Sequence, residues 1–272
     1  MAITTLAGLK AGLKPPEHLM KAATTTEGGG IYNSTFYLAG QPEAAVAPSP
    51  GLDGAALTSY AGQIPYHNPV SGNGYLASLD GGYLANTVTS FTSGLVCDRL
   101  WHNSGISITT TTAQAITSPT WPARDVNGST NGEGVFVGLE VSSATGNGSP
   151  ITNTTLDYTN SDGVSGRTGT ISMPATANAG TFVFFQLQAG DKGVRSIQGI
   201  TLGTSYVSGT MHLVAVRPIL DFFNEKLGDT KTEDAIAIGF PRLFDDSVLF
   251  TMFLGHAGSS LSNCITFGFA HG

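Results

Sequence analysis

Charged side chains are scarce in this chain: aspartate, glutamate, lysine and arginine together make up 11% of its 272 residues. Ordinary soluble domains carry about 25%. Intrinsic disorder needs low hydrophobicity and high net charge, and the 40% of hydrophobic residues exclude it. Lysine and glutamate side chains usually keep the surface of a free monomer hydrated. We therefore expect much of this surface to contact other protein.

Positive charge is the scarcer of the two signs, with 12 lysines and arginines against 19 acids and a net charge of −7. Nucleic-acid-binding domains usually present a basic face, so we expect no direct nucleic-acid binding. The imbalance is local, because residues 221–246 are acidic while residues 1–24 are basic. These two segments either attract each other between neighbouring copies or are ordinary solvated stretches.

Cysteines and long apolar runs are also few. Cys97 and Cys264 cannot form a disulfide framework for a chain of this size, and we expect both to be buried free thiols. The six histidines are scattered, so no metal or other cofactor is expected. The longest apolar run, Val248 to Leu254, is too short to span a bilayer. Lys10 and Lys14 interrupt the N-terminus where a secretory signal needs its apolar core, so we expect neither a membrane span nor secretion.

The usual catalytic motifs are missing: there is no phosphate-binding loop, no Gly-x-Ser-x-Gly elbow and no His-Glu-x-x-His. Glu133 and Glu140 could resemble a glycosidase pair, but their spacing along a strand puts them about 23 Å apart. We interpret these glutamates, together with Asp98 beside Arg99, as members of ion pairs at the rim of the folded domain. The run from Asp157 to Gly163 resembles a calcium loop only faintly, and a hairpin turn explains it better. We therefore predict that the protein is not an enzyme.

Glycine is abundant, with 36 residues, and it divides the first third of the chain. Within residues 1–30, leucines recur at helical spacing, Pro15-Pro16-Glu17 fits a helix start, and Gly28 to Gly30 supply a hinge. We predict a partly helical N-terminal arm there. Residues 31–93 are predicted to be a long Gly/Pro-rich extended segment, with one short helix at 54–61 after Asp53.

From residue 94 the pattern changes to short segments rich in valine, isoleucine, threonine and aromatics, separated by turn residues. The predicted strands are 94–100, 106–112, 134–142, 152–158, 168–173, 180–187, 197–202, 210–220, 247–254 and 264–269. Strands at this spacing without intervening helices indicate an all-β fold. We predict a β-sandwich or jelly roll over residues 94–272.

Both tryptophans stand beside an arginine–aspartate pair, Trp101 after Arg99 and Trp121 before Arg124. Tryptophan and arginine are favoured at the centres of protein interfaces. We therefore predict Trp101, Arg99, Trp121 and Arg124 as candidate interface residues. Packing onto the core is the other interpretation, and we favour it for Trp101, which follows a strand of apolar residues, whereas Trp121 is expected to meet a neighbouring subunit. Because Trp121 lies between prolines, as in some sugar-stacking sites, carbohydrate binding stays open as an alternative.

Six motifs spread between about residues 30 and 250 carry a resemblance to a known family. They are Leu100–Ile106, Trp121–Asp125, Gly134–Ser142, Thr152–Thr155, Ala45–Gly51 and Gly199–Tyr206. Together they resemble virion structural proteins of tailed double-stranded DNA bacteriophages, of the decoration or cement kind. The final stretch, Ser259 to Gly272, resembles the family only loosely.

The resemblance implies a β-rich protein of the virion, assembled in the host cytoplasm, that stabilises the capsid shell. Its implied partners are the major capsid protein and copies of itself, with a trimer as the first expectation. No catalytic residue is carried over. A tail or neck component (tube, adaptor or baseplate subunit) is the nearest alternative, and a receptor- or carbohydrate-binding virion module is the second.

Overall fold

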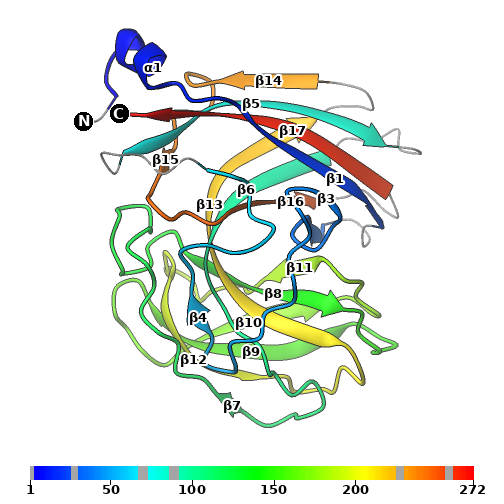
Figure 1. Ribbon diagram of the computed structural model, residues 1–272. Helices are drawn as coiled ribbons and strands as arrows, with labels where there is room; N and C mark the ends of the chain where they lie inside the picture. The colour runs from blue at the N-terminus through cyan, green and yellow to red at the C-terminus, as the bar shows by residue number, and fades with distance from the viewer. Residues whose placement is uncertain (1–2, 26–29, 67–72, 86–91, 225–229, 255–259) are drawn as a thin grey trace.

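The computed structural model describes residues 3–25, 30–66, 73–85, 92–224, 230–254 and 260–272. Regular structure within these residues is almost entirely β, with seventeen strands and one helix, α1 (Leu6–Gly12). The predicted all-β class is therefore confirmed. The strands form three layers, which we call the upper sheet, the central barrel and the lower sheet after their places in Figure 1.

The central barrel is a seven-stranded sheet in which six strands close into a ring. The order around the ring is β13 (Thr210–Asn224), β8 (Phe136–Ser143), β11 (Thr181–Phe184), β2 (Tyr32–Ser34), β16 (Leu249–Leu254) and β6 (Thr92–His102). Pairing of β6 with β13 closes the ring, and β4 (Ala55–Ala56) pairs with β6 outside it. Closure removes free sheet edges from these six strands.

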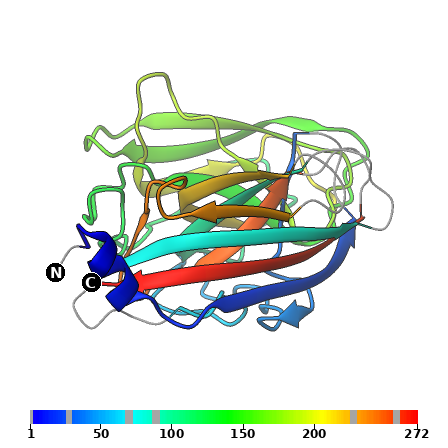
Figure 2. The same cartoon turned by 90° about the horizontal axis from the view of Figure 1, so that it is seen from above.

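The other two sheets are open. The upper sheet has the order β14 (Thr230–Asp234), β5 (Gly74–Ala85), β17 (Ser260–His271), β1 (Glu17–Thr25) and β3 (Gly40–Gln41), and β15 (Arg242–Leu243) also pairs with β5. The lower sheet has the order β10 (Arg167–Met173), β9 (Ile151–Asn160), β12 (Val194–Thr201) and β7 (Gln114–Ala115). Figure 2 shows the upper sheet from above, with α1 and both termini at one end of it.

Three apolar cores fill this stack. One lies between the barrel and the lower sheet, one lies inside the barrel, and one lies between the barrel and the upper sheet. Burial of each large apolar side chain contributes about 1.5–3 kcal/mol, so these cores provide the main stabilisation. The sheets pack face to face as a sandwich predicts, and the middle layer is in addition closed on itself.

Strand β13 contributes to all three cores because it is long and irregular. Leu213 faces the lower core and Val214 the barrel interior, as the alternation of a strand requires. A register shift between Pro218 and Leu220 then lets Phe222 reach the upper core. In Figure 1 this strand curves from the bottom of the molecule to its top.

Two glycines leave room for aromatic rings within these layers. A Cβ atom at Gly138 would collide with the ring of Phe182 inside the barrel. A Cβ atom at Gly94 would collide with the ring of Phe222 in the upper core. Each ring therefore packs directly against the backbone of a neighbouring strand.

Nine of the ten predicted strands coincide with an observed strand, within a few residues at their ends. The strand predicted at 106–112 is wrong. There the backbone turns, with Thr110 N donating to the Ser107 carbonyl, while the Gln114 side chain bonds both N and O of Ser107. Threonine-rich composition favours strands, but local side-chain hydrogen bonds decide otherwise here.

The predicted N-terminal arm is only partly correct. Helix α1 forms, and Thr5 Oγ1 caps it by accepting from Gly8 N at 3.0 Å. A helix start at Pro15-Pro16-Glu17 is wrong, because β1 begins at Glu17 and pairs with β17 along the upper sheet. The buried Leu19 belongs to the upper core, so this part of residues 1–30 is integral to the fold. Of the predicted glycine hinge, only Gly30 lies within the described residues.

The predicted boundary at residue 93 is wrong as well. Strands β2 and β5 come from the segment 31–93, yet β2 completes the barrel and β5 pairs with β17. The helix predicted after Asp53 is absent: Ala55 and Ala56 pair with β6, and Asp53 Oδ1 accepts from Thr117 N at 2.7 Å. Residues far apart in the chain thus share each layer, which local patterns cannot reveal.

Cys97 and Cys264 are free thiols, Cys97 buried and Cys264 half-buried on the upper sheet. No helix among the described residues is long and apolar enough to cross a membrane.

Candidate functional site

Strand β6 carries charged side chains on both of its faces. Arg99 points into the barrel, where its guanidinium lies over the rings of Phe36 and Phe250 at 4.6 and 5.8 Å from their centroids. Its neighbour Asp98 points to the opposite side. Both are fully buried. Burying a charge costs several kcal/mol unless partners compensate for the lost water, so each requires its own network.

The barrel network joins three strands and a loop. Arg99 Nη2 lies 2.8 Å from Oε2 of Glu140 on β8, and the Tyr37 hydroxyl donates to the same oxygen at 2.8 Å. Burial alone would raise the pKa of Glu140, but Arg99 and the hydroxyls of Tyr37 and Ser34 outweigh it and lower that pKa. Glu140 is therefore an anion and Arg99 a cation inside the barrel.

Two neutral histidines extend this network. Arg99 Nε donates to His102 Nδ1 at 3.2 Å, so that nitrogen must be an acceptor. Burial, Arg99 and His212 lower the pKa of His102 to about 2. His212 Nδ1 donates to the Asn103 carbonyl and its Nε2 accepts from Ser142, each at 2.8 Å. Burial lowers the pKa of His212 too.

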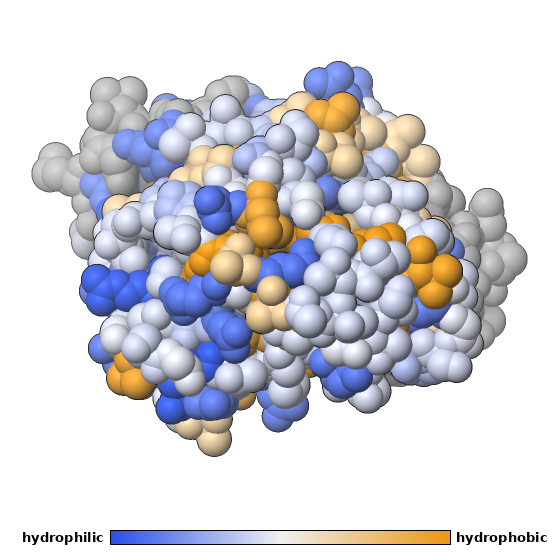
Figure 3. Space-filling model, turned by 90° about the horizontal axis from the view of Figure 1, so that it is seen from below, coloured by the Kyte–Doolittle hydropathy of each residue, from blue (hydrophilic) through white to orange (hydrophobic). Residues whose placement is uncertain are grey.

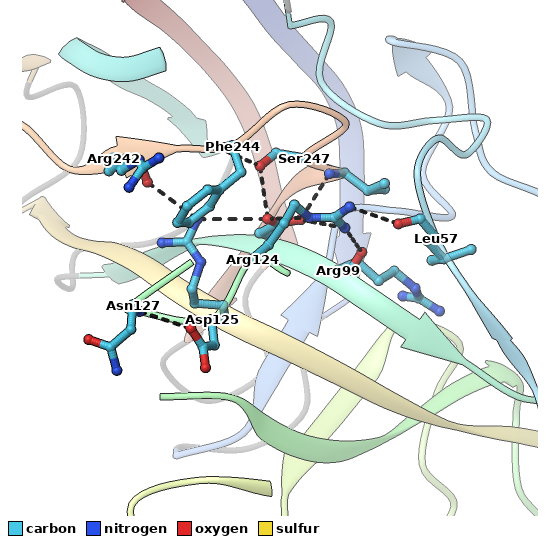
Figure 4. A network of polar contacts seen from close by, with 11 residues as sticks. Leu57, Arg99, Arg124, Asp125, Asn127, Arg242, Phe244 and Ser247 are labelled. Atoms are coloured by element: carbon cyan, nitrogen blue, oxygen red, sulfur yellow. Dashed lines mark hydrogen bonds and ion pairs between the residues drawn. The ribbon is translucent and has the colours of Figure 1, made fainter. Parts of the chain in front are cut away.

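The second network surrounds Asp98 on the other side of β6. Figure 4 labels its members Arg124, Ser247 and Leu57. Arg124 binds both carboxylate oxygens, with Nε at 3.0 Å from Oδ2 and Nη2 at 3.2 Å from Oδ1. Ser247 Oγ and Val248 N each donate to Asp98 at 2.9 Å, and Arg217 Nη2 lies 3.7 Å away. Arg124 also donates to the Leu57 carbonyl at 2.9 Å. Asp98 thus ties a loop, β6 and the start of β16 together.

The two tryptophans are packed inside the chain. Their rings lie 5.5 Å apart, centroid to centroid, in the core between the barrel and the lower sheet. Trp101 Nε1 donates to the Asp53 carbonyl at 3.1 Å, and Trp121 Nε1 donates to the Val194 carbonyl at 2.7 Å. Because both polar edges are bonded and both rings buried, neither can stack a sugar in this conformation.

The four candidate interface residues, Trp101, Arg99, Trp121 and Arg124, all lie in the interior, where the tryptophans contact each other and the arginines belong to two different networks. Each is at most 3% exposed. A partner subunit cannot reach them, so Trp101 packs in the core as favoured, and the interface prediction is corrected to an interior role for Trp121, Arg99 and Arg124. The rim ion pairs predicted around Glu140 and Arg99 are likewise buried, not peripheral.

Sequence neighbours do not pair in either network. Asp98 binds Arg124 rather than Arg99, and Asp125 caps its own loop by accepting from Asn127 N and Ser129 N. Successive side chains of a strand point to opposite faces, which separates Asp98 from Arg99. Pairing therefore follows the sheet and not the chain.

Several members of these networks escaped the sequence analysis: Tyr37, His102, His212, Arg217 and Ser247. A signal existed for some of them. Glu140 interrupts the apolar run Val135 to Val141, and His212 and Arg217 lie within the apolar β13. A charged or polar residue inside such a run indicates a buried partner.

The hairpin interpretation of residues 157–163 is confirmed. Strands β9 and β10 pair there, and Gly163 N donates to the Asn160 carbonyl at 3.0 Å. Asn160 and Arg167 both bind Asp191, at 2.7 and 2.9 Å. Within the described residues, no group of three or more histidines, cysteines and acids could hold a metal ion.

Two hollows described on the surface flank α1. One of about 390 Å³ lies between α1 and the C-terminal residues His271 and Gly272. The other, of about 290 Å³, lies between α1 and the turn that contains Ile236 and Phe240. The opposite face of the molecule is weakly polar with a band of hydrophobic side chains across it (Figure 3).

Comparisons with known proteins found no matching family model and no matching curated protein. Among solved structures, the chain is similar to the VP2 subviral particle protein of infectious bursal disease virus, at 8% identity and a TM-score of 0.17, covering 96% of this chain and 82% of that one. A structure of the T13 particle of the same virus gives 11% identity and a TM-score of 0.18, covering 94% and 78%.

Proposed function

We propose that this chain is a structural subunit of a virus particle, and specifically a decoration (cement) protein on the shell of a tailed bacteriophage. The observation that carries the proposal is how the chain uses its few charges. Arg99 and Glu140 pair inside the barrel, and Asp98 and Arg124 pair where a loop meets strand β6. Buried ion pairs of this kind suit a rigid structural subunit. The exterior, which is poor in charge, is then available for contacts with other proteins.

The sequence motifs support the same conclusion. The segments that resemble phage virion proteins include Leu100–Ile106 and Gly134–Ser142, which contribute β6 and β8 to the barrel. They also include Trp121–Asp125, which supplies Trp121 and Arg124 to the interior. The resemblance thus lies in segments that build the layered core, as expected for a family that shares a scaffold.

In this proposal the partners are the major capsid protein and copies of the chain itself, and the working location is the assembled virion. A tail or neck position is the alternative. The burial of Trp101 and Trp121 removes the observation on which a sugar-binding module rested. No residue is assigned a catalytic role.

Immunogold labelling of purified virions tests the proposal. Label spread over the whole shell supports a decoration protein. Label at one vertex or along the tail contradicts the decoration role and supports the tail or neck alternative. If neither labelling nor mass spectrometry detects the protein in virions, the structural role is contradicted altogether.

A further inference from the structure

The strongest feature outside the buried networks is the surface around α1. The chain after α1 joins the upper sheet, where Leu13 pairs with Ala270 and Lys14 N donates to the Phe269 carbonyl at 2.9 Å. A Cβ atom at Gly12 would collide with the backbone of His271, so the helix sits directly against the C-terminal strand. The helix is therefore held in a defined place at one end of the sheet.

On its other flank α1 faces the turn after β14, and the two enclose the hollow of about 290 Å³. Its lining is mainly apolar: Ile3, Thr4, Thr5, Leu6, Leu9, Ala235, Ile236 and Phe240. Two lining residues also protrude, since Leu6 is 74% and Ile236 89% exposed. Ile236 is the most exposed large hydrophobic residue among those described. An apolar knob thus stands beside an apolar hole.

The turn presents Ile236 in a fixed position. Asp234 Oδ1 accepts from Ile236 N at 3.0 Å and from Ala237 N at 2.9 Å, and Ile238 N donates to the Asp234 carbonyl at 3.0 Å. These bonds shape the turn from its start. An ordered turn loses little conformational entropy when a partner covers it.

Opposite charges flank the patch. Lys10 follows Leu6 by four residues, which places the two side chains on the same face of α1. Asp234 lies at the start of the turn that carries Ile236. Among the described residues, neither side chain forms an ion pair. One copy therefore offers both a positive and a negative group beside an apolar knob and hole.

We propose that this patch binds the same patch of a second copy of the chain across a two-fold axis. Ile236 of each copy then enters the hollow of the other, and Lys10 of each meets Asp234 of the other. A two-fold contact needs a self-complementary surface, and the patch is complementary in both shape and charge. The contact is small and therefore weak alone, but it gains strength when other contacts hold subunits side by side in a particle. The proposed two-fold contact therefore rests on the proposed function, because that function holds the subunits side by side.

Sedimentation velocity of the full chain over a concentration series tests this contact. We expect reversible dimers, and Ile236→Asp should weaken dimerisation by about a hundredfold because two isoleucines leave the contact. The matched control is Val207→Asp. Val207 is 63% exposed elsewhere, and its φ of 69° suits aspartate. It should dimerise as the wild type does, and circular dichroism should show both variants folded.

A charge cycle adds a second readout. Lys10→Gln and Asp234→Asn should each weaken dimers about three- to tenfold, and the asparagine keeps the oxygen that shapes the turn. The double variant should be no weaker than either single variant, because the two groups bind each other. Additive losses would contradict the pairing.

A wild type that stays monomeric, or an Ile236→Asp variant that dimerises normally, overturns the proposal. If the wild type is monomeric but Ile236→Asp loses binding to virions, the patch contacts another virion protein and the proposed function stands. If dimers form through the patch but virions lack the protein, the contact stands and the proposed function fails.

Discussion

The two charge networks on strand β6 lie back to back, and they differ in how completely their carboxylates are bonded, although Arg217 Nε in the Asp98 network also lacks a protein partner. Each oxygen of Asp98 accepts two hydrogen bonds from Arg124, Ser247 and Val248 N. In the barrel, Glu140 Oε2 pairs with Arg99 and accepts a hydrogen bond from Tyr37. Glu140 Oε1 and Arg99 Nη1 have no protein partner.

The difference shows two uses of a buried charge. The Asp98 network includes backbone groups of loops, at Leu57 and Val248, so it fixes where these loops attach. The barrel pair joins side chains of β6 and β8, which are already aligned because both pair with β13. A buried carboxylate with both oxygens bonded specifies one arrangement, whereas a carboxylate with one unbonded oxygen gives a smaller gain in stability. The following predictions test this comparison, from the largest expected effect to the smallest.

Replacement of Asp98 by alanine should have the largest effect. It leaves the buried Arg124 without its counter-charge and Val248 N without an acceptor. We expect the free energy of unfolding to fall by about 3–5 kcal/mol, measured by urea denaturation. A loss below 1 kcal/mol would show that the network does not anchor the loops.

The barrel pair should tolerate an apolar exchange. Glu140→Leu alone leaves Arg99 as an uncompensated cation and should cost about 3 kcal/mol. The double variant Glu140→Leu, Arg99→Met should recover most of that loss, because it removes both charges and the unbonded atoms. The matched double variant Asp98→Leu, Arg124→Met should not recover, since backbone groups there stay unbonded. Equal recovery in both would contradict the comparison.

Acid should destabilise the barrel network through its histidines. The pKa of His102 is lowered to about 2, whereas an unfolded histidine titrates near 6.5. A group with a depressed pKa stabilises the fold fully above its unfolded pKa, and this stability is lost as pH falls. We expect His102 to account for a loss of about 2 kcal/mol between pH 6.5 and 5.

The measurement is urea denaturation at several pH values. His102→Gln should flatten the dependence in that range, while replacement of the exposed His18 is the control. A His102→Gln variant with the wild-type slope would mean that the ring is already protonated in the folded protein.

Removal of one hydroxyl from each network should have the smallest effect. Tyr37→Phe deletes a donor to Glu140, and Ser247→Ala deletes a donor to Asp98. We expect losses of about 1–2 kcal/mol by thermal or urea denaturation, larger for Tyr37→Phe because Glu140 has fewer other partners. The reverse order would show that Glu140 is better solvated than its protein contacts indicate.

Much of the sheet content was predictable because it depends on local composition. Runs such as 210–220 and 247–254 are rich in β-branched and aromatic residues, and strands β13 and β16 form there. The errors arose where long-range pairing overrides local preference. Glu17 follows two prolines as in a helix start, yet β17 pairs with that segment and makes it a strand.

The site was less predictable than the fold. The sequence singled out Arg99, Trp101, Trp121 and Arg124, because an arginine–aspartate pair recurs beside each tryptophan. It favoured core packing for Trp101 and an interface for the others, since tryptophan and arginine are enriched at interface centres. Burial of all four depends on the lower sheet and on loops that arrive from distant parts of the chain.

The sequence by itself determined the all-β class, most strand positions and a surface poor in charge, because composition and period-two patterns act over a few residues. Only the tertiary structure decided that the middle sheet closes into a barrel and that Asp98 and Arg99 turn to different partners. Both outcomes depend on which strands become neighbours. That choice is made by the burial of side chains far apart in the chain, and no local pattern records it.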